Sequence, residues 1–168
     1  GESLAVLGRN GAGKTTLLRT IMGLLTPASG RLDFESAALA AMPTHRRAGL
    51  GIGYMPEDRR LVPGLSAEEN ILLPAWAAGA EDAAARLAHV YEAIPELTAL
   101  SDRKALQLPG GQQKPVALGR ALMAGRKLLL LDEPFEGVAP VLARRLAEVI
   151  SGLRKTGLSV VISESSMT

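Results

Sequence analysis

A glycine-rich run near the start of the chain has the residue types and spacing of a phosphate-binding loop. The pattern G-x-x-x-x-G-K-[ST] is matched at every fixed position by the run Gly8-Arg9-Asn10-Gly11-Ala12-Gly13-Lys14-Thr15-Thr16. The glycines let the backbone turn tightly, so that successive N–H groups and the positive end of a following helix face phosphate oxygens. The Lys14 ammonium would bind those oxygens, and the Thr15 hydroxyl would ligate Mg²⁺. The run therefore predicts nucleotide binding, with Arg9 and Asn10 serving only as backbone donors.

A phosphate-binding loop connects a buried strand to a helix, and the segments on either side of this run have those two patterns. Residues 3–7 form an apolar run typical of a buried strand, and residues 15–22 have the spacing of a helix that leaves the loop. The alternative is a glycine-rich turn with a chance lysine. A turn of that kind does not require a buried strand before it and a helix after it, so we favour the phosphate-binding interpretation.

An acidic pair follows a second apolar run. Residues 127–131 contain four consecutive leucines and lead directly into Asp132, Glu133 and Pro134. Ligands of open parallel sheets bind at the carboxyl ends of the strands. There Asp132 would hold Mg²⁺ directly or through water, and Glu133 would orient and deprotonate a water for in-line attack on a γ-phosphate. Two solvated acids at a strand end are the alternative, which the phosphate loop makes the weaker one.

The composition limits the fold and the partners. With 168 residues the chain fits one domain, and its 47% hydrophobic but only 3% aromatic content predicts an aliphatic core. The 19 basic and 17 acidic residues are mixed along the chain, so we expect no nucleic-acid partner. The sequence has no cysteine, which excludes disulfides and thiolate metal sites. No apolar run approaches the roughly 20 residues of a membrane span, so we expect any membrane contact to come through a partner.

The remaining spacing patterns describe a layered α/β chain. They predict further strands at 31–34, 51–55 and 158–163 and helices at 112–124 and 140–155. The section from Pro56 to Pro109 has a helical pattern, in which Ser66 is an N-cap with an acid three residues on. The leucine strand needs cover on both sheet faces, because its apolar run is continuous. The sequence thus predicts an α/β fold with a mostly parallel sheet flanked by helices.

Taken together, these motifs resemble the nucleotide-binding domain of an ATP-binding cassette (ABC) transporter, over essentially the whole chain. The resemblance is carried by GRNGAGKTT, by YMPEDRR after the strand at 51–55, by LPGGQQKPVALGRALM, by LLLLDEP and by the closing strand. Within the family, YMPEDRRLVPGLSAEEN and DEPFEGVAP are most similar to the ATPases of branched-chain amino-acid importers.

The resemblance implies a P-loop NTPase core over residues 1–60 and 110–168, with an inserted helical subdomain over about 61–109. It implies ATP and Mg²⁺ as ligands, hydrolysis that drives transport through transmembrane permease subunits, and a peripheral position at the cytoplasmic face of the membrane. The chain begins within the approach to its first strand and closes just after another strand, so we expect a truncated domain without the adenine-stacking segment. A soluble cassette ATPase that acts on nucleic acid is a rival, against which the mixed charge and YMPEDRR argue.

The family resemblance also implies a shared site. Nucleotide-binding domains of this kind pair head to tail, as homodimers or heterodimers, and hold ATP between the phosphate loop of one subunit and the LSGGQ-type signature of the other. On this chain the signature falls on Leu108, Pro109, Gly110, Gly111 and Gln112. Glycine N–H groups at a helix N-terminus are suited to grip a γ-phosphate across such an interface.

Three positions that normally sense the γ-phosphate depart from the family pattern. Pro109 replaces the signature serine and has neither a hydroxyl nor an N–H, and Pro115 would crowd the carbonyl of Gly111 unless the helix starts late. Glu57 replaces a glutamine that reaches the metal and the attacking water, although a carboxylate can still meet Mg²⁺. Ser165 aligns with the switch histidine but is too short and not basic. A nucleotide-binding module with impaired or absent hydrolysis is therefore the alternative to an active ATPase.

Three further residue types are weaker candidates. His45 and His89 have no partner at metal-ligand spacing, so we interpret both as surface or packing residues. For Trp76 we favour core packing over contact with a membrane partner. Arg59 and Arg60 are either a solvated pair or part of a surface that transmits motion, and the sequence leaves both interpretations open.

Overall fold

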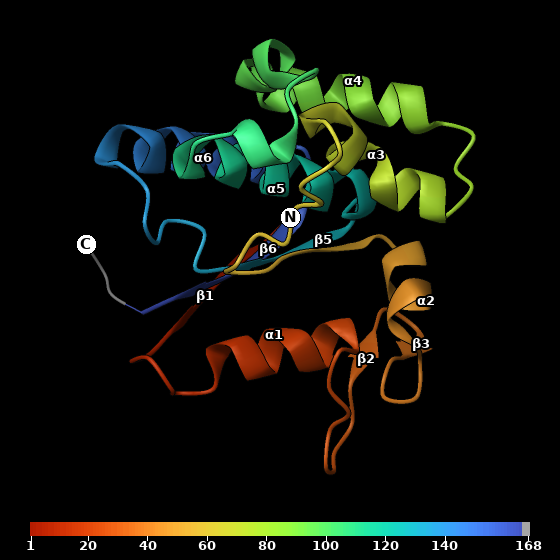
Figure 1. The fold of residues 1–168 in the computed structure, drawn as a ribbon. Helices are drawn as coiled ribbons and strands as arrows, with labels where there is room; N and C mark the ends of the chain where they lie inside the picture. The colour runs from red at the N-terminus through yellow and green to blue at the C-terminus, as the bar shows by residue number, and fades with distance from the viewer. Residues whose placement is uncertain (166–168) are drawn as a thin grey trace.

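The fold is a parallel sheet between two helical layers. The computed structural model describes residues 1–165. Its main sheet has the strand order β1-β6-β5-β4, all parallel, with β1 at Ser3–Leu7, β4 at Ile52–Met55, β5 at Leu128–Asp132 and β6 at Ser159–Glu164. As Figure 1 shows, α1 (Lys14–Met22) covers one face, and α5 (Gly110–Ala124) and α6 (Pro140–Lys155) cover the other. The predicted α/β fold with a parallel sheet is confirmed.

A further helical layer lies on α5, away from the sheet. It consists of α3 (Ala67–Ala77), α4 (Ala83–Ala93) and the short 3₁₀ helices η1 (Pro95–Leu100) and η2 (Ala105–Gln107). Buried apolar side chains of α3, α4, η1, α5, β5 and α6 form one continuous cluster. The described elements between residues 61 and 109 are thus helical, while their division from the core as a subdomain stays a prediction.

Strand β5 separates two apolar cores. Leu129 and Leu131 belong to the cluster with α5 and α6, whereas Leu130 packs with Leu18 of α1, and all four side chains are fully buried. Successive side chains of a strand point to opposite faces. The side chain of Asp132 therefore points to the same face of the sheet as that of Leu130, the face that α1 covers. This places the Asp132 carboxylate next to the helix that follows the phosphate loop.

The carboxyl ends of all four main strands meet at one edge of the sheet, because the strands are parallel. The loop of residues 8–13 follows β1, Glu57 comes shortly after β4, Glu133 directly follows β5, and Ser165 directly follows β6. Segments that are far apart in the sequence are thereby brought to one place.

Two small elements were not predicted. The strand expected at 31–34 is reduced to β2 (Asp33–Phe34), which pairs antiparallel with β3 (Ala37–Ala38). Helix α2 (Thr44–Gly49) has no side-chain cap, and its buried Arg47 donates to main-chain carbonyls near the end of α1. Strand β3 has only two residues, which is too short for an alternating pattern, and α2 has six residues and no side-chain cap, so neither of these two elements was predicted.

The helix starts agree with their sequence signals in one case and correct them in another. Ser66 caps α3 as predicted, because its Oγ accepts from the Glu69 N–H at 3.1 Å and Glu69 Oε2 accepts from the Ser66 N–H at 2.7 Å. Helix α5 begins at Gly110, two residues earlier than predicted, and continues through Pro115. Pro115 therefore removes one hydrogen bond to the Gly111 carbonyl without ending the helix.

Trp76 is 52% exposed on α3, so the core-packing interpretation of this residue is wrong. Among the helices of residues 1–165, none combines the length and the apolar character that crossing a membrane requires.

Candidate nucleotide-binding site

The phosphate loop is an open turn that leaves backbone donors free. Gly11 and Gly13 have φ angles of 85° and 94°, in the left-handed region that favours glycine. Helix α1 then begins at Lys14 with no side-chain cap. Within the described part of the chain, the N–H groups of residues 13–16 have no hydrogen-bond acceptor. Unpaired donors at a helix N-terminus are suited to an anion.

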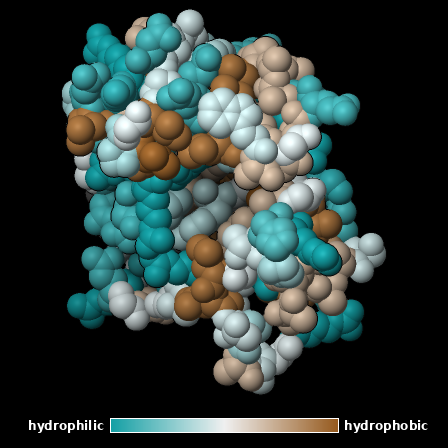
Figure 2. All heavy atoms as spheres, turned by 45° about the vertical axis from the view of Figure 1, so that its right-hand side comes forward, coloured by the Kyte–Doolittle hydropathy of each residue, from teal (hydrophilic) through white to brown (hydrophobic). Residues whose placement is uncertain are grey.

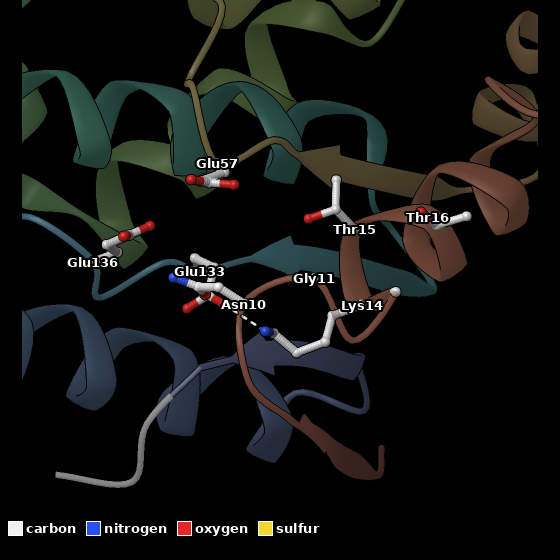
Figure 3. A pocket seen from close by; sticks show the side chains of 9 residues that line it. Asn10, Gly11, Lys14, Thr15, Thr16, Glu57, Glu133 and Glu136 are labelled. Atoms are coloured by element: carbon white, nitrogen blue, oxygen red, sulfur yellow. Dashed lines mark ion pairs between the residues drawn. The ribbon is translucent and has the colours of Figure 1, made fainter.

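These donors line a pocket of about 330 Å³ at the carboxyl edge of the sheet (Figure 3). Its walls are formed by Asn10, Gly11, Gly13, Lys14, Thr15, Thr16, Glu57, Glu133 and Glu136. All of these except Glu136 are residues that the sequence predicts for the site. Arg9 and Ala12 are exposed and do not line it.

Lys14 lies at the centre of the pocket with its ammonium fully engaged. The side chain is 7% exposed, and Nζ donates to the carbonyls of Gly8 at 2.8 Å and Arg9 at 3.3 Å. It also forms an ion pair of 3.2 Å with Glu133 Oε1, drawn as a dashed line in Figure 3. The predicted phosphate-binding lysine and the candidate base therefore form an ion pair with each other in this conformation.

Asp132 is fully buried and oriented by hydroxyl groups from three elements. Its Oδ1 accepts from Ser163 Oγ at 2.5 Å and from Thr15 Oγ1 at 3.2 Å, and its Oδ2 accepts from the Tyr54 hydroxyl at 3.5 Å. Burial, and next the charge of Asp132, raise the pKa of Tyr54, so the phenol keeps the proton that it donates. Two of the three predicted metal ligands, Thr15 and Asp132, are thus in direct contact.

Glu133 has an unusual backbone conformation, and its N–H, its carbonyl and its carboxylate all form hydrogen bonds. Its φ of 47° lies in the left-handed region, which costs a residue with a Cβ atom free energy. Its N–H donates to the Ser163 carbonyl at 3.1 Å, and its carbonyl accepts from Lys114 Nζ at 2.6 Å. The carboxylate Oε2 accepts from the Ser165 N–H at 3.0 Å and from its Oγ at 3.2 Å. Ser165 thus contacts the candidate base.

Glu57 lies beside a second glutamate, Glu136, in the lining of the pocket. Burial, and next the neighbouring carboxylate of Glu136, raise the pKa of Glu57. Glu136 comes from the loop after β5 and was not predicted, because an exposed acid in a loop carries no distinguishing spacing. In Figure 3 both side chains lie on the same side of the pocket, across from Thr15.

The signature segment lies outside this pocket. Pro109 is the N-cap of α5, with φ −54° and ψ 150° and no side-chain cap bond. Within residues 1–165, the N–H groups of Gly110 and Gly111 have no acceptor, whereas those of Gln112 and Gln113 bond to the Pro109 carbonyl at 2.8 and 3.2 Å. Pro109, Gly111 and Gln112 line a separate apolar cavity between α5 and α6.

Hydrogen bonds from two arginines, Arg59 and Arg120, connect the loop after β4 to α5. Arg59 and Arg60 have positive φ angles of 63° and 47°, and the guanidinium of Arg120 on α5 donates to both of their carbonyls. Arg59 Nη1 donates in turn to the Gly110 carbonyl at 3.1 Å. The loop that carries Glu57 is thus linked to the start of the signature helix, and the choice between a solvated pair and a transmitting surface for Arg59 and Arg60 stays open.

The residues present fit a phosphate group with Mg²⁺. Free N–H groups and an ammonium are anion ligands, and the hydroxyl and carboxylate of Thr15 and Asp132 are oxygen ligands that Mg²⁺ accepts. In the described part of the chain, no group of three or more His, Cys, Asp or Glu side chains forms a metal site by itself. Mg²⁺ commonly takes its other ligands from phosphate and water, so one hydroxyl and one carboxylate suffice.

Three residues that contact Asp132 or Glu133 were not predicted from the sequence. Ser163, Tyr54 and Lys114 act on the acidic pair from β6, β4 and α5. Ser163 pairs with Asp132 in the sheet register, so only the strand order β5–β6 could have pointed to it. A lysine in a helix normally lies at the surface, so nothing local marked Lys114 as buried.

The comparison with protein families decides the identity of the fold. A model of the ABC transporter family matches residues 1–136. The chain belongs to this family. The resemblance inferred from the motifs is confirmed, and by this membership the chain is an ATP-binding protein of the ABC ATPase class.

Curated relatives cover nearly all of the chain. It is 37% identical over 166 residues to the high-affinity branched-chain amino acid transport ATP-binding protein BraG of Pseudomonas aeruginosa, covering 99% of this chain and 71% of the relative. It is 37% identical to the probable branched-chain amino acid transport ATP-binding protein LivF of Archaeoglobus fulgidus, covering 89% and 64%. The lipopolysaccharide export system ATP-binding protein LptB of Escherichia coli K12 is 33% identical, with 99% and 70% covered.

Solved structures agree on the fold. A nucleotide-free ATP-binding cassette from an ABC transporter superposes with a TM-score of 0.80 at 30% identity, covering 97% of this chain and 70% of that chain. A dimeric ATP-binding cassette bound to ADP and Pi has a TM-score of 0.86 at 24% identity, covering 98% and 75%, and this likeness concerns the fold alone.

Proposed function

We propose that this ABC protein binds Mg-ATP in the pocket at the carboxyl edge of the sheet and hydrolyses it to drive the import of branched-chain amino acids through membrane partners. The observation that carries the proposal is the meeting of four predicted side chains in one place. Lys14 Nζ lies 3.2 Å from Glu133 Oε1, and Thr15 Oγ1 lies 3.2 Å from Asp132 Oδ1.

Lys14 changes partners when phosphate enters. Its ammonium has three donors, and these now engage two loop carbonyls and the Glu133 carboxylate. Binding a phosphate oxygen requires that Lys14 release at least one of them. Release of Glu133 Oε1 leaves that oxygen as a free acceptor, so substrate binding itself unmasks the base. The free N–H groups of residues 13–16 hold the phosphates in place.

Asp132 and Glu133 have different roles in the proposed reaction. Asp132 and Thr15 are the Mg²⁺ ligands, and Ser163 and Tyr54 keep the Asp132 carboxylate in orientation. Bound there, Mg²⁺ would neutralise charge that develops on the transferred phosphoryl group. Glu133 takes the proton of the attacking water on Oε1, while Oε2 stays hydrogen-bonded to Ser165. Glu57 also lines the pocket, and its carboxylate would be a further ligand for Mg²⁺ or for a water bound to it.

A second copy of a nucleotide-binding domain completes the site. The free N–H groups of Gly110 and Gly111 at the start of α5 are the donors that this chain lends to its neighbour. Pro109 supplies no hydroxyl there, so the lent half makes fewer bonds than a serine would allow.

The membrane partner docks on the face that Figure 2 shows, where a hollow separates two groups of apolar atoms. A cavity of about 350 Å³ lies between α1, α2, α3 and α5, and Met22, Leu24 and Ile52 contribute to its walls. Trp76, on the helix α3 that borders this cavity, is half exposed and suits an apolar contact.

The substrate is proposed from the relatives alone. BraG and LivF are branched-chain amino acid transport proteins by name and are 37% identical to this chain, whereas LptB serves lipopolysaccharide export and is 33% identical. The margin is small, so the substrate is a separate part of the test.

A second candidate function is a nucleotide-binding module with impaired hydrolysis. It is favoured by Pro109, which lacks the signature hydroxyl, and by Ser165, which bonds to Glu133 where the family has a histidine. Such a module binds ATP and closes, but turns over slowly.

One reconstitution separates these functions. The protein and its permease partners are placed in proteoliposomes, and ATP hydrolysis and uptake of labelled leucine are measured for wild type and Glu133→Gln. We expect the substitution to lower hydrolysis about 10²- to 10⁴-fold, the usual contribution of a general base, while ATP binding is kept. Hydrolysis without leucine uptake would reject the substrate, and a wild-type rate no higher than that of Glu133→Gln would establish the second candidate.

A further inference from the structure

Lys114 is a buried cation that the proposed reaction does not yet use. It lies in the second turn of α5, is 2% exposed, and its Nζ donates to the Glu133 carbonyl at 2.6 Å. Among residues 1–165 it has no ion pair and no second hydrogen-bond acceptor. Burial, and next the charge of Arg59, lower its pKa. Burying an ammonium against one carbonyl is unfavourable, and an apolar side chain would fill the same space at less cost. Packing alone therefore does not account for a lysine here.

The acceptor of this bond is the main-chain carbonyl of Glu133, a residue that is hydrogen-bonded through both of its flanking peptide groups. Glu133 has a φ of 47°, a conformation that persists in a residue with a Cβ atom only where surrounding bonds hold it. In the peptide before its Cα, the Glu133 N–H donates to the Ser163 carbonyl at 3.1 Å and to Ser163 Oγ at 3.2 Å. In the peptide after its Cα, the Glu133 carbonyl accepts from the Glu136 N–H at 3.2 Å and from Lys114 Nζ, which is the only side-chain donor to this carbonyl within residues 1–165.

The backbone conformation of Glu133 decides where its carboxylate points. The Cα–Cβ direction follows φ and ψ, so rotation of either flanking peptide would change where the Glu133 side chain points in the pocket that it lines. A shift of about 1 Å in a reacting group costs up to 10²-fold in rate. A bond to the main chain of the base is therefore a direct means of controlling hydrolysis.

We propose that Lys114 is a positioning residue for ATP hydrolysis, whose ammonium fixes the left-handed main chain of Glu133 and thereby aims the carboxylate at the attacking water. This proposal rests on the proposed role of Glu133 as the base. Lys114 does not line the nucleotide pocket, so it contributes to turnover and not to nucleotide affinity. Because α5 also carries Gly110 and Gly111, the helix that meets the neighbouring subunit is the one that holds the base of this subunit.

The absence of cysteine allows a test that changes only the ammonium. Lys114→Cys protein is alkylated while unfolded, in one portion with 2-bromoethylamine and in the other with 1-bromopropane, and both are refolded. The two side chains have the same length and shape, and only the first ends in an ammonium. We expect the propyl protein to have a kcat at least about tenfold lower than the aminoethyl protein, with KM and the Kd for ATP changed less than about threefold.

The matched control removes a similar bond that does not end on Glu133. Gln113 Nε2, on the same helix, donates to the Leu108 carbonyl at 2.9 Å. Gln113→Met is expected to keep kcat within about threefold of wild type. Equal kcat values for the two alkylated proteins would overturn the positioning role, and so would a parallel loss of ATP affinity in the propyl protein.

A double substitution separates failure of this inference from failure of the proposed function. If Lys114 acts only through Glu133, Lys114→Met lowers the wild-type rate but leaves the residual rate of Glu133→Gln unchanged. Additive losses would assign Lys114 to general stability and contradict the proposal, as would loss of folding in every chain that lacks the ammonium. If wild type is no faster than Glu133→Gln, it is the proposed role of the base that has failed.

Discussion

The N-termini of α1 and α5 both present backbone N–H groups to a phosphate, but they differ in the number of free N–H groups and in the side chains of the first turn. At α1 the loop glycines take positive φ angles, the N–H groups of residues 13–16 stay free, and Lys14 and Thr15 stand in the first turn. At α5 only the N–H groups of Gly110 and Gly111 stay free within the described residues, and neither a lysine nor a hydroxyl accompanies them in the first turn.

This difference shows that the two halves of the proposed ATP site are not equally equipped in one chain. We expect the half at α1 to bind phosphate by itself, since it combines free backbone donors with a buried cation. The half at α5 offers two backbone donors, and its lysine turns inward to the Glu133 carbonyl. We therefore expect the N-terminus of α1 to hold nucleotide and the N-terminus of α5 to contact nucleotide that a neighbouring copy already holds.

Replacement of Lys14 gives the largest expected effect and tests whether the α1 half is self-sufficient. Lys14→Met removes a charge-assisted bond to phosphate, worth about 1.5–3 kcal/mol, so the Kd for ATP rises about 10- to 100-fold in calorimetry. Arg9→Met, at an exposed position outside the pocket, is the control. Equal affinities of Lys14→Met and wild type would mean that the backbone donors alone carry binding.

A pair of glycine substitutions compares the backbones of the two halves. Gly13 has a φ of 94°, so Gly13→Ala places a Cβ atom in the left-handed region and costs about 1–2 kcal/mol. A methyl group at Gly111 in α5 would meet only Leu142 Cδ2, at 3.6 Å, so Gly111→Ala is neutral or stabilising by up to about 1 kcal/mol. Thermal unfolding is expected to show a Tm about 2–8 °C lower for the first, and an unchanged or higher Tm for the second. The reverse order would contradict the difference in backbone.

Restoring the signature hydroxyl tests how much the α5 half has lost. Pro109→Ser adds one donor and one N–H at the N-cap, and a hydrogen bond contributes about 0.5–1.5 kcal/mol. Turnover is therefore expected to rise about 2- to 10-fold, and ATP-driven dimerisation in the Glu133→Gln background to strengthen. ADP binding by the monomer should not change. If turnover and dimerisation both stay at wild-type levels, Pro109 is no defect.

The smallest expected effect concerns charge in the α1 half. The pKa of Glu57 is raised, so above its ordinary value of 4.5 the folded chain still holds a proton that the unfolded chain has lost. The contribution of Glu57 to stability therefore falls as pH rises through the window just above 4.5. Glu57→Gln removes this fall, so its Tm decreases less than that of wild type between about pH 4.5 and 7, by about 1 °C. Glu81→Gln, on an exposed turn, is the control, and an unchanged pH dependence in Glu57→Gln would contradict the assignment.

Parts of the site that are built from adjacent residues could be predicted, whereas parts that depend on contacts between distant residues could not. The loop at 8–16 and the acids after the leucine strand could be predicted because their chemistry is written in adjacent residues. Glu136 and Lys114 could not, since an exposed loop acid and a helical lysine look alike wherever they occur. For Trp76 the sequence favours the core because tryptophan is usually buried, and only the packing of α3 leaves it exposed.

By itself, the sequence determined the family, the phosphate loop, the order of the main elements and the identity of the acidic pair, because these depend on residue type and short spacing. Only the tertiary structure decided that β6 lies between β1 and β5, which places Ser163 on Asp132 and Ser165 on Glu133. It also decided that Lys14 and Glu133 hold each other and that Lys114 is buried beneath them. The physical reason is that spacing fixes which face of an element is apolar, whereas the partner of each face is chosen by packing across the whole chain.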